Sequence, residues 1–93
     1  MLLHVTTVRW LKEYILRLEF DNGSVKVVDL KDELHGEIFE PLNDIHLFRQ
    51  VAINRDTKTI KWPNGADFAP EFLYAIGEEV TAVASEEQAF AFA

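Results

Sequence analysis

Residues 14–29 read YILRLEFDNGSVKVVD, which predicts two antiparallel strands joined by a tight turn. Every second residue of the first half is large and apolar, and this period of two is typical of a strand with one buried face. The dipeptide Asn22-Gly23 follows, and it is the strongest short hairpin signal because both residues tolerate a positive φ. We therefore expect strands over residues 14–20 and 24–29.

A further strand is expected before this hairpin, over residues 4–9. Residues 5–8 are all β-branched, a composition that favours strands. The polar pair Lys12-Glu13 then interrupts the pattern and provides a turn. The three strands together predict an antiparallel meander.

The next part of the chain predicts two short helices. Asp29 is a suitable N-cap for a helix of one or two turns over residues 30–35. Asn43 or Asp44 is a suitable N-cap for a second one over residues 45–50. The residues between them give no regular pattern.

A second hairpin and a final helix are expected in the C-terminal half. Apolar and β-branched residues predict strands over 51–55 and 59–62, joined by a turn. A tight turn follows at 63–65, because Pro-Asn-Gly suits consecutive turn positions. Pro70 suits the first turn of a helix that ends at Gly77 and lies on the sheet.

These elements predict a single α+β domain over residues 1–77. Its small antiparallel sheet consists of a three-stranded meander plus a two-stranded hairpin, with short helices and a C-terminal helix packed on one face. Residues 78–93 form an acidic tail that contains alanine and phenylalanine. We expect this tail to be mobile, unless Phe90 and Phe92 dock on this or another subunit.

The charges are unevenly distributed along the 93 residues, which carry a formal net charge of −7. The bases are concentrated in residues 49–61, whereas residues 32–48 and 62–93 contain acids and no lysine or arginine. A negative protein repels nucleic acid and attracts basic proteins. We therefore expect no direct nucleic-acid binding, and either a basic protein partner or a surface that serves solubility alone.

The composition also bears on location. Cysteine is absent, which excludes disulfides and cysteine-based metal sites. The apolar start Met1–Leu3 is too short for a signal peptide, and no apolar run is long enough for a membrane span. We expect a cytoplasmic protein with no membrane association.

One group of side chains is a candidate partner- or ligand-binding site, where the fifth predicted strand leads into the last helix. Its members are Trp62, Asn64, Asp67, Glu71 and Tyr74. In a structural interpretation, Asn64 shapes the turn, Asp67 satisfies backbone donors at the start of the helix, and the two rings pack. In a functional interpretation, a shallow pocket or partner contact is rimmed by Trp62, Asn64 and Asp67.

No catalytic set is apparent. The two serines, Ser24 and Ser85, have no neighbouring base in the sequence. The histidines, His4, His35 and His46, lack the spacing of metal ligands. We expect no catalytic residue, no metal site and no cofactor.

Two stretches resemble bacterial domain-of-unknown-function family 2442. They are LRLEFDNGS, residues 16–24, and TIKWPNGADFAPEFLY, residues 59–74. The resemblance covers about residues 4–77 and implies a small α+β domain with an antiparallel sheet. It further implies a protein that acts alone, joined to a helix-turn-helix segment, or beside a second small protein in a toxin–antitoxin-like pair. Because so little chain follows Gly77, we expect no helix-turn-helix here.

The sequence and the resemblance together predict a non-enzymatic protein-interaction or regulatory module of the antitoxin-like kind. Its partner would be a small basic protein encoded nearby. One alternative is a small-ligand-binding or enzymatic domain that uses the Trp62–Asp67 loop. A second alternative is a structural protein that self-associates, as a homodimer, through a strand edge or the C-terminal tail.

Overall fold

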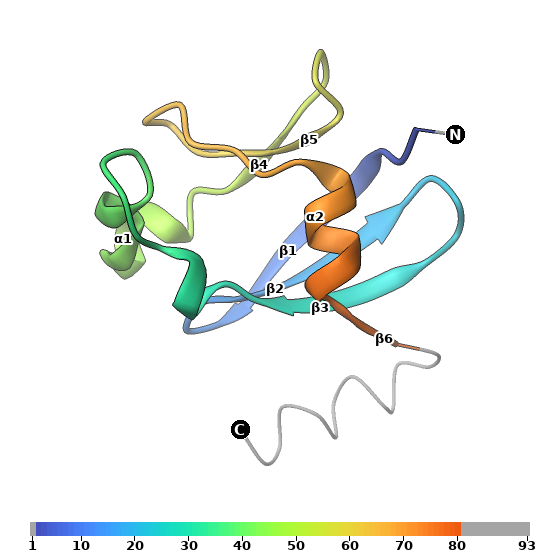
Figure 1. The fold of residues 1–93 in the computed structure, drawn as a ribbon, viewed down its shortest axis with the longest axis horizontal. Coiled ribbons are helices and arrows are strands. Elements are labelled where there is room, and N and C mark those ends of the chain that lie inside the picture. The colour runs from blue at the N-terminus through green and yellow to red at the C-terminus, as the bar shows by residue number, and fades with distance from the viewer. Residues whose placement is uncertain (1, 81–93) are drawn as a thin grey trace.

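A computed structural model describes residues 2–80 of the chain (Figure 1). An antiparallel sheet has the strand order β1 (Val5–Lys12), β2 (Ile15–Phe20), β3 (Val25–Asp29) and β6 (Glu78–Glu79). A second antiparallel sheet consists of β4 (Ala52–Asn54) and β5 (Thr59–Lys61). The helices are α1 (Ile45–Phe48) and α2 (Pro70–Ile76), with 3₁₀ turns η1 (Lys31–Glu33) and η2 (Glu40–Asn43). The predicted α+β class is confirmed.

The predicted meander is present, and the hairpin between β2 and β3 turns at Gly23. This glycine has a φ of +89°, which other residues rarely adopt. Strand β1 extends beyond the predicted end at residue 9, because a register shift between Trp10 and Lys12 lets it continue beside β2. Glu13, with a φ of +46°, then makes the turn into β2.

The two predicted short helices are shorter than expected. In place of a helix over 30–35 there is only the 3₁₀ turn η1, whose N-cap is Leu30 and which has no side-chain cap. Leu30 and Leu34 are both buried, and their insertion into the core turns the chain after η1. The second helix, α1, ends at Phe48, and its cap is Asp44, whose Oδ1 accepts from the His46 amide at 3.0 Å.

Helix α2 crosses one face of the larger sheet, above β3 (Figure 1). Leu73 is fully buried, and Gly77 follows the last helical residue. A Cβ at Gly77 would lie 2.9 Å from Cγ2 of Val28, so glycine permits a close approach of the helix end to β3.

Strand β6 follows at once and pairs with β3, and the Val80 amide donates to the Val25 carbonyl at 2.8 Å. The sheet therefore extends two residues past the domain end that we predicted at residue 77. The predictions for residues 81–93, including Phe90 and Phe92, lie outside the described residues.

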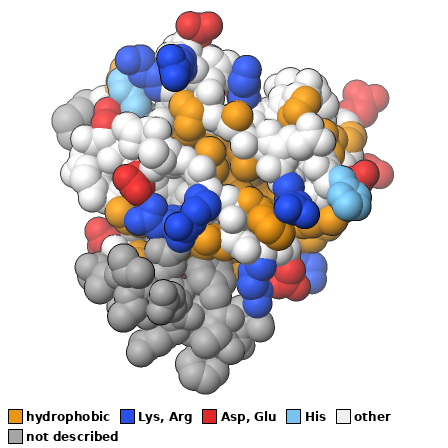
Figure 2. Space-filling view, turned by 180° about the vertical axis from the view of Figure 1, so that it is seen from behind, with side chains coloured by type: hydrophobic (Ala, Val, Ile, Leu, Met, Phe, Trp, Pro, Cys, Tyr) orange, Lys and Arg blue, Asp and Glu red, His pale blue; other side chains and the backbone are white. Residues whose placement is uncertain are grey.

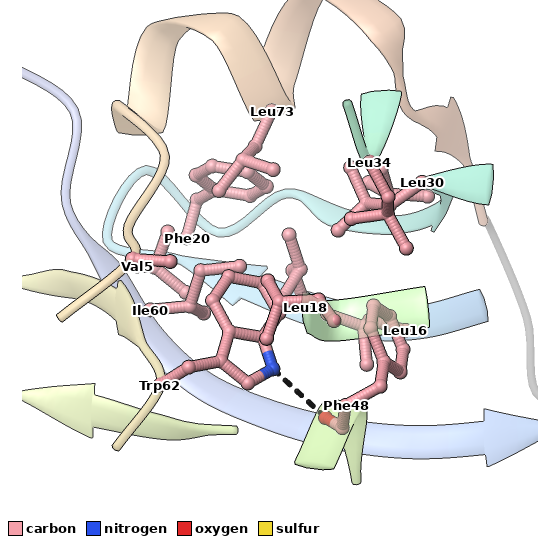
Figure 3. Packing of buried hydrophobic residues seen from close by; sticks show 13 residues of the cluster. Val5, Leu16, Leu18, Phe20, Leu30, Leu34, Phe48, Ile60, Trp62 and Leu73 are labelled. Carbon is pink, nitrogen blue, oxygen red and sulfur yellow. Dashed lines mark hydrogen bonds between the residues drawn. The ribbon is translucent and has the colours of Figure 1, made fainter. Parts of the chain in front are cut away.

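The core lies between the sheet, the β4–β5 hairpin and helix α2 (Figure 3). Strand β2 contributes Leu16, Leu18 and Phe20 from one face, as the alternation predicts. Full burial of each such side chain favours folding by about 1.5–3 kcal/mol. Within residues 2–80, no helix is long and apolar enough to cross a bilayer.

Candidate functional site

Trp62, the first residue of the candidate site, is 2% exposed. Its indole Nε1 donates to the Phe48 carbonyl at 2.8 Å, and its ring packs against that of Phe48 (Figure 3). The Trp62 ring also contacts the ring of Phe68. The side chain is therefore part of the core and links β5 to helix α1. It does not rim a pocket.

Asn64 connects the tight turn to a distant segment. Its Oδ1 accepts from the Ala66 amide at 3.1 Å, which shapes the turn at Gly65. Its Nδ2 donates to the Ile38 carbonyl at 2.9 Å. Phe68 adds a second link to the same segment, because its ring stacks on Phe39 with centroids 4.6 Å apart. The turn therefore supports the chain around residues 38 and 39.

Tyr74 joins helix α2 to the β2–β3 hairpin. Its hydroxyl lies 3.3 Å from Ser24 Oγ and accepts from Asn22 Nδ2 at 3.5 Å, and its ring packs edge-on against Phe20. Lys26 Nζ donates to the Tyr74 carbonyl at 2.7 Å and lies 3.8 Å from the ring centroid. Hydrogen bonding by Ser24 and Asn22, helped by the Lys26 charge, lowers the pKa of Tyr74.

Asp67 and Glu71 are exposed. The expectation that Asp67 supplies the cap of the last helix is wrong: the N-cap of α2 is Ala69, and no side chain bonds there. Asp67 instead forms a β-bridge with Lys61, and the extended backbone at Ala69 separates it from the helix.

The five predicted site residues are thus not gathered around one pocket. Trp62, Asn64 and Tyr74 pack or hold backbone, and only Asp67 and Glu71 present charge to solvent. A binding role for the two carboxylates stays a prediction.

An acidic loop, residues 32–44, lies on the segment that Asn64 and Phe68 support. Its carboxylates belong to Asp32, Glu33, Glu37, Glu40 and Asp44, and it contains no lysine or arginine. Ile38, between them, is 44% exposed. A shallow depression of about 370 Å³ is lined by Glu37, Glu40 and Pro41.

A second, larger depression of about 480 Å³ lies between the start of β1, the β2–β3 turn and the β4–β5 hairpin. Its lining residues are His4, Val5, Thr6, Asp21, Ile53, Arg55 and Lys58. His4 Nδ1 lies 2.9 Å from Asp21 Oδ2, and the His4 amide donates to Asp21 Oδ1 at 3.1 Å. Three basic side chains therefore share this depression with one carboxylate.

The model of a family described as "Protein of unknown function (DUF2442)" matches residues 5–79. The chain belongs to this family. The match confirms the resemblance and ends where β6 ends. The description names no activity. No curated protein and no solved structure is detectably similar to this chain.

The structure shows what side chains of the two stretches that resemble this family contact in the fold. Asn22 and Ser24 of the first stretch meet Tyr74 of the second, and Asn64 and Phe68 of the second hold the acidic loop. These five side chains therefore contribute to the stability of the fold.

The depression that contains His4, Arg55 and Lys58, called the basic depression below, was not predicted from the sequence. Its residues come from three separate segments of the chain. The concentration of bases in residues 49–61 was the available signal, since Arg55 and Lys58 lie there. On the face shown in Figure 2, lysine and arginine side chains border a patch of apolar ones. Within residues 2–80, no group of three or more His, Asp or Glu side chains is arranged to hold a metal ion.

Proposed function

We propose that this DUF2442 domain is a non-enzymatic, regulatory protein-interaction module of the antitoxin-like kind. The acidic loop binds a small basic protein encoded nearby. The observation that carries the proposal is the exposed Ile38 in the middle of a loop that has five carboxylates and no cation. An apolar anchor surrounded by charges of one sign is suited to a partner that carries the opposite charge around an apolar pocket.

The acidic loop is attached to the rest of the domain by hydrogen bonds and a ring contact. Asn64 Nδ2 bonds to the Ile38 carbonyl, and Phe68 stacks on Phe39. Asn43 Nδ2 donates to the carbonyls of Leu34 and Glu40, both at 2.9 Å. A preorganised loop loses less conformational entropy on binding, so more of its contact energy contributes to affinity.

The geometry favours a supporting role over a catalytic one for the Trp62–Asp67 loop. The Trp62 indole is buried and hydrogen-bonded, and both polar atoms of the Asn64 amide bond to backbone. Neither side chain presents a free polar group to a substrate.

The test is co-expression with the protein of the adjacent gene, followed by purification and measurement of the dissociation constant by calorimetry. We expect a stable complex whose affinity falls as salt screens the charges. The variant Glu37→Gln/Ile38→Ser/Glu40→Gln should weaken it by at least about tenfold.

The matched control is Glu78→Gln/Glu79→Gln, which removes the same number of charges at exposed positions outside the acidic loop and should leave the affinity unchanged. No complex at low salt, or equal losses in both variants, would contradict the proposal. A symmetric homodimer through the same loop, detected by sedimentation, would favour the self-association alternative instead.

A further inference from the structure

We propose that the depression lined by His4, Arg55 and Lys58 is a binding site for a small organic anion that carries a phosphate group. This site is built from other elements than the acidic loop, and it does not depend on the function proposed above. It lies where the start of β1 and the β2–β3 turn meet the β4–β5 hairpin.

The charges in this depression favour an anion. Among residues 2–80, neither Arg55 nor Lys58 has a side-chain hydrogen bond or ion pair, although acids greatly outnumber bases in the chain. The one carboxylate, Asp21, is already occupied, since both of its oxygens contact His4. Two unpaired cations therefore face a depression whose one lining carboxylate already has a hydrogen-bonding partner. A guanidinium and an ammonium are the usual donors to phosphate.

The backbone of the hairpin holds these cations in place. Asn54 Oδ1 accepts from the amides of Asp56 and Thr57, at 2.9 and 3.3 Å, and the Asn54 carbonyl accepts from the Lys58 amide at 2.7 Å. The Lys58 carbonyl in turn accepts from the Val5 amide at 2.9 Å. The turn that carries Arg55 is thus fixed to the start of β1.

Lys58 adopts a backbone conformation that a lysine rarely takes. Its φ is +59°, in the left-handed region where glycine and asparagine are favoured. A strained residue at the rim of a depression is typical of a functional position, because a less strained residue would serve the turn better. We attribute the retention of lysine at this strained position to a binding role of its ammonium group.

The remaining lining indicates the rest of the ligand. Val5 is buried and Ile53 half-buried, so the depression has an apolar part beside its cations. Its volume of about 480 Å³ lies within the range of small-ligand sites. These features fit a phosphate attached to a ring or another apolar body better than free phosphate.

The test is a titration of ¹⁵N-labelled full-length protein with AMP, inorganic phosphate and adenosine, followed by NMR. We expect saturable shifts of the amides of Val5, Thr6, Ile53, Arg55 and Lys58, with AMP binding at a dissociation constant of about 1 mM or tighter. Phosphate should bind more weakly at the same amides, and adenosine should not bind. The variant Arg55→Gln/Lys58→Asn should weaken AMP binding by at least about tenfold.

The matched control is Lys31→Gln/Lys61→Gln, which makes the same change in charge outside the depression and should bind AMP like the parent. Three outcomes would overturn the proposal. They are no saturable shift with AMP or phosphate, equal loss of binding in both variants, and adenosine binding as tightly as AMP.

Discussion

The side-chain amide of Asn64 donates to the backbone carbonyl of Ile38 at 2.9 Å, across 26 positions of the sequence. This bond joins the tight turn after β5 to the exposed apolar residue of the acidic loop. The stability of the domain and the shape of the proposed binding surface therefore depend on the same side chain.

Replacement of Asn64 by alanine removes the bonds to Ile38 and Ala66 together. We expect the free energy of unfolding to fall by about 1–2 kcal/mol, because each net hydrogen bond contributes about 1 kcal/mol and one of these is exposed. Urea denaturation measures this change. The complex with the basic partner should also weaken, since the loop loses a support. Asn64→Ala with unchanged stability would show that the turn does not depend on these bonds.

Gly77 permits the contact between the end of α2 and β3, so Gly77→Ala should destabilise the domain. The added Cβ would lie 2.9 Å from Val28 Cγ2 and 3.0 Å from the Leu73 carbonyl oxygen, too close without a backbone shift. Overpacking of this kind costs about 1–3 kcal/mol in free energy of unfolding. The comparison is Gly23→Ala, where open space surrounds the site and only the positive φ of +89° opposes the change. If the contact with β3 is the cause, the NMR signals of Val28 and Leu73 should shift in Gly77→Ala and not in Gly23→Ala. Unchanged signals of both residues in Gly77→Ala would contradict this explanation.

Local signals predicted the two hairpins, because alternation and Asn-Gly act over a few residues. The same signals could not predict which partners the long-range side chains find. Trp62 was expected to be either packed or at the rim of a pocket, and only its bond to Phe48 shows that it lies inside. The η1 turn was predicted as a helix because Asp29 is a suitable N-cap residue. The N-cap in the structure is Leu30, without a side-chain cap, and the burial of Leu30 and Leu34 on either side of η1 leaves only a 3₁₀ turn.

The candidate site was predicted less well than the fold, for a physical reason. A binding surface forms where separate segments meet, and the sequence gives no measure of their distance. His4, Asp21 and Lys58 are far apart in the chain and share one depression. The charge pattern of residues 49–61 indicated a local concentration of bases, but not that β1 would supply the other wall.

Glu19 should make the stability of the domain depend on acidic pH. The hydrogen bond from Arg17, with Nη1 and Oε2 2.6 Å apart, lowers the pKa of Glu19 in the folded state. The ionised form therefore stabilises the fold fully above the ordinary pKa of about 4.3, and this contribution is lost as pH falls through the lower folded value. Urea denaturation should give a lower free energy of unfolding for Glu19→Gln than for the parent at pH 7. This difference should disappear below the lowered pKa of Glu19. A constant difference across this range would mean that Glu19 acts by packing and not by charge.

Lys58→Asn should separate stability from binding in the basic depression. Asparagine adopts the left-handed region more readily than lysine, so the free energy of unfolding should stay the same or rise by up to about 1 kcal/mol. AMP binding should weaken, because one of the two unpaired cations is gone. Lys61→Asn, in β5 with an exposed side chain, is the control, and it should leave AMP binding unchanged. Thermal unfolding and the NMR titration measure the two properties on the same samples. Lower stability of Lys58→Asn with unchanged AMP binding would contradict both expectations. Lysine would then serve the structure of the turn, and its ammonium group would not be part of the site.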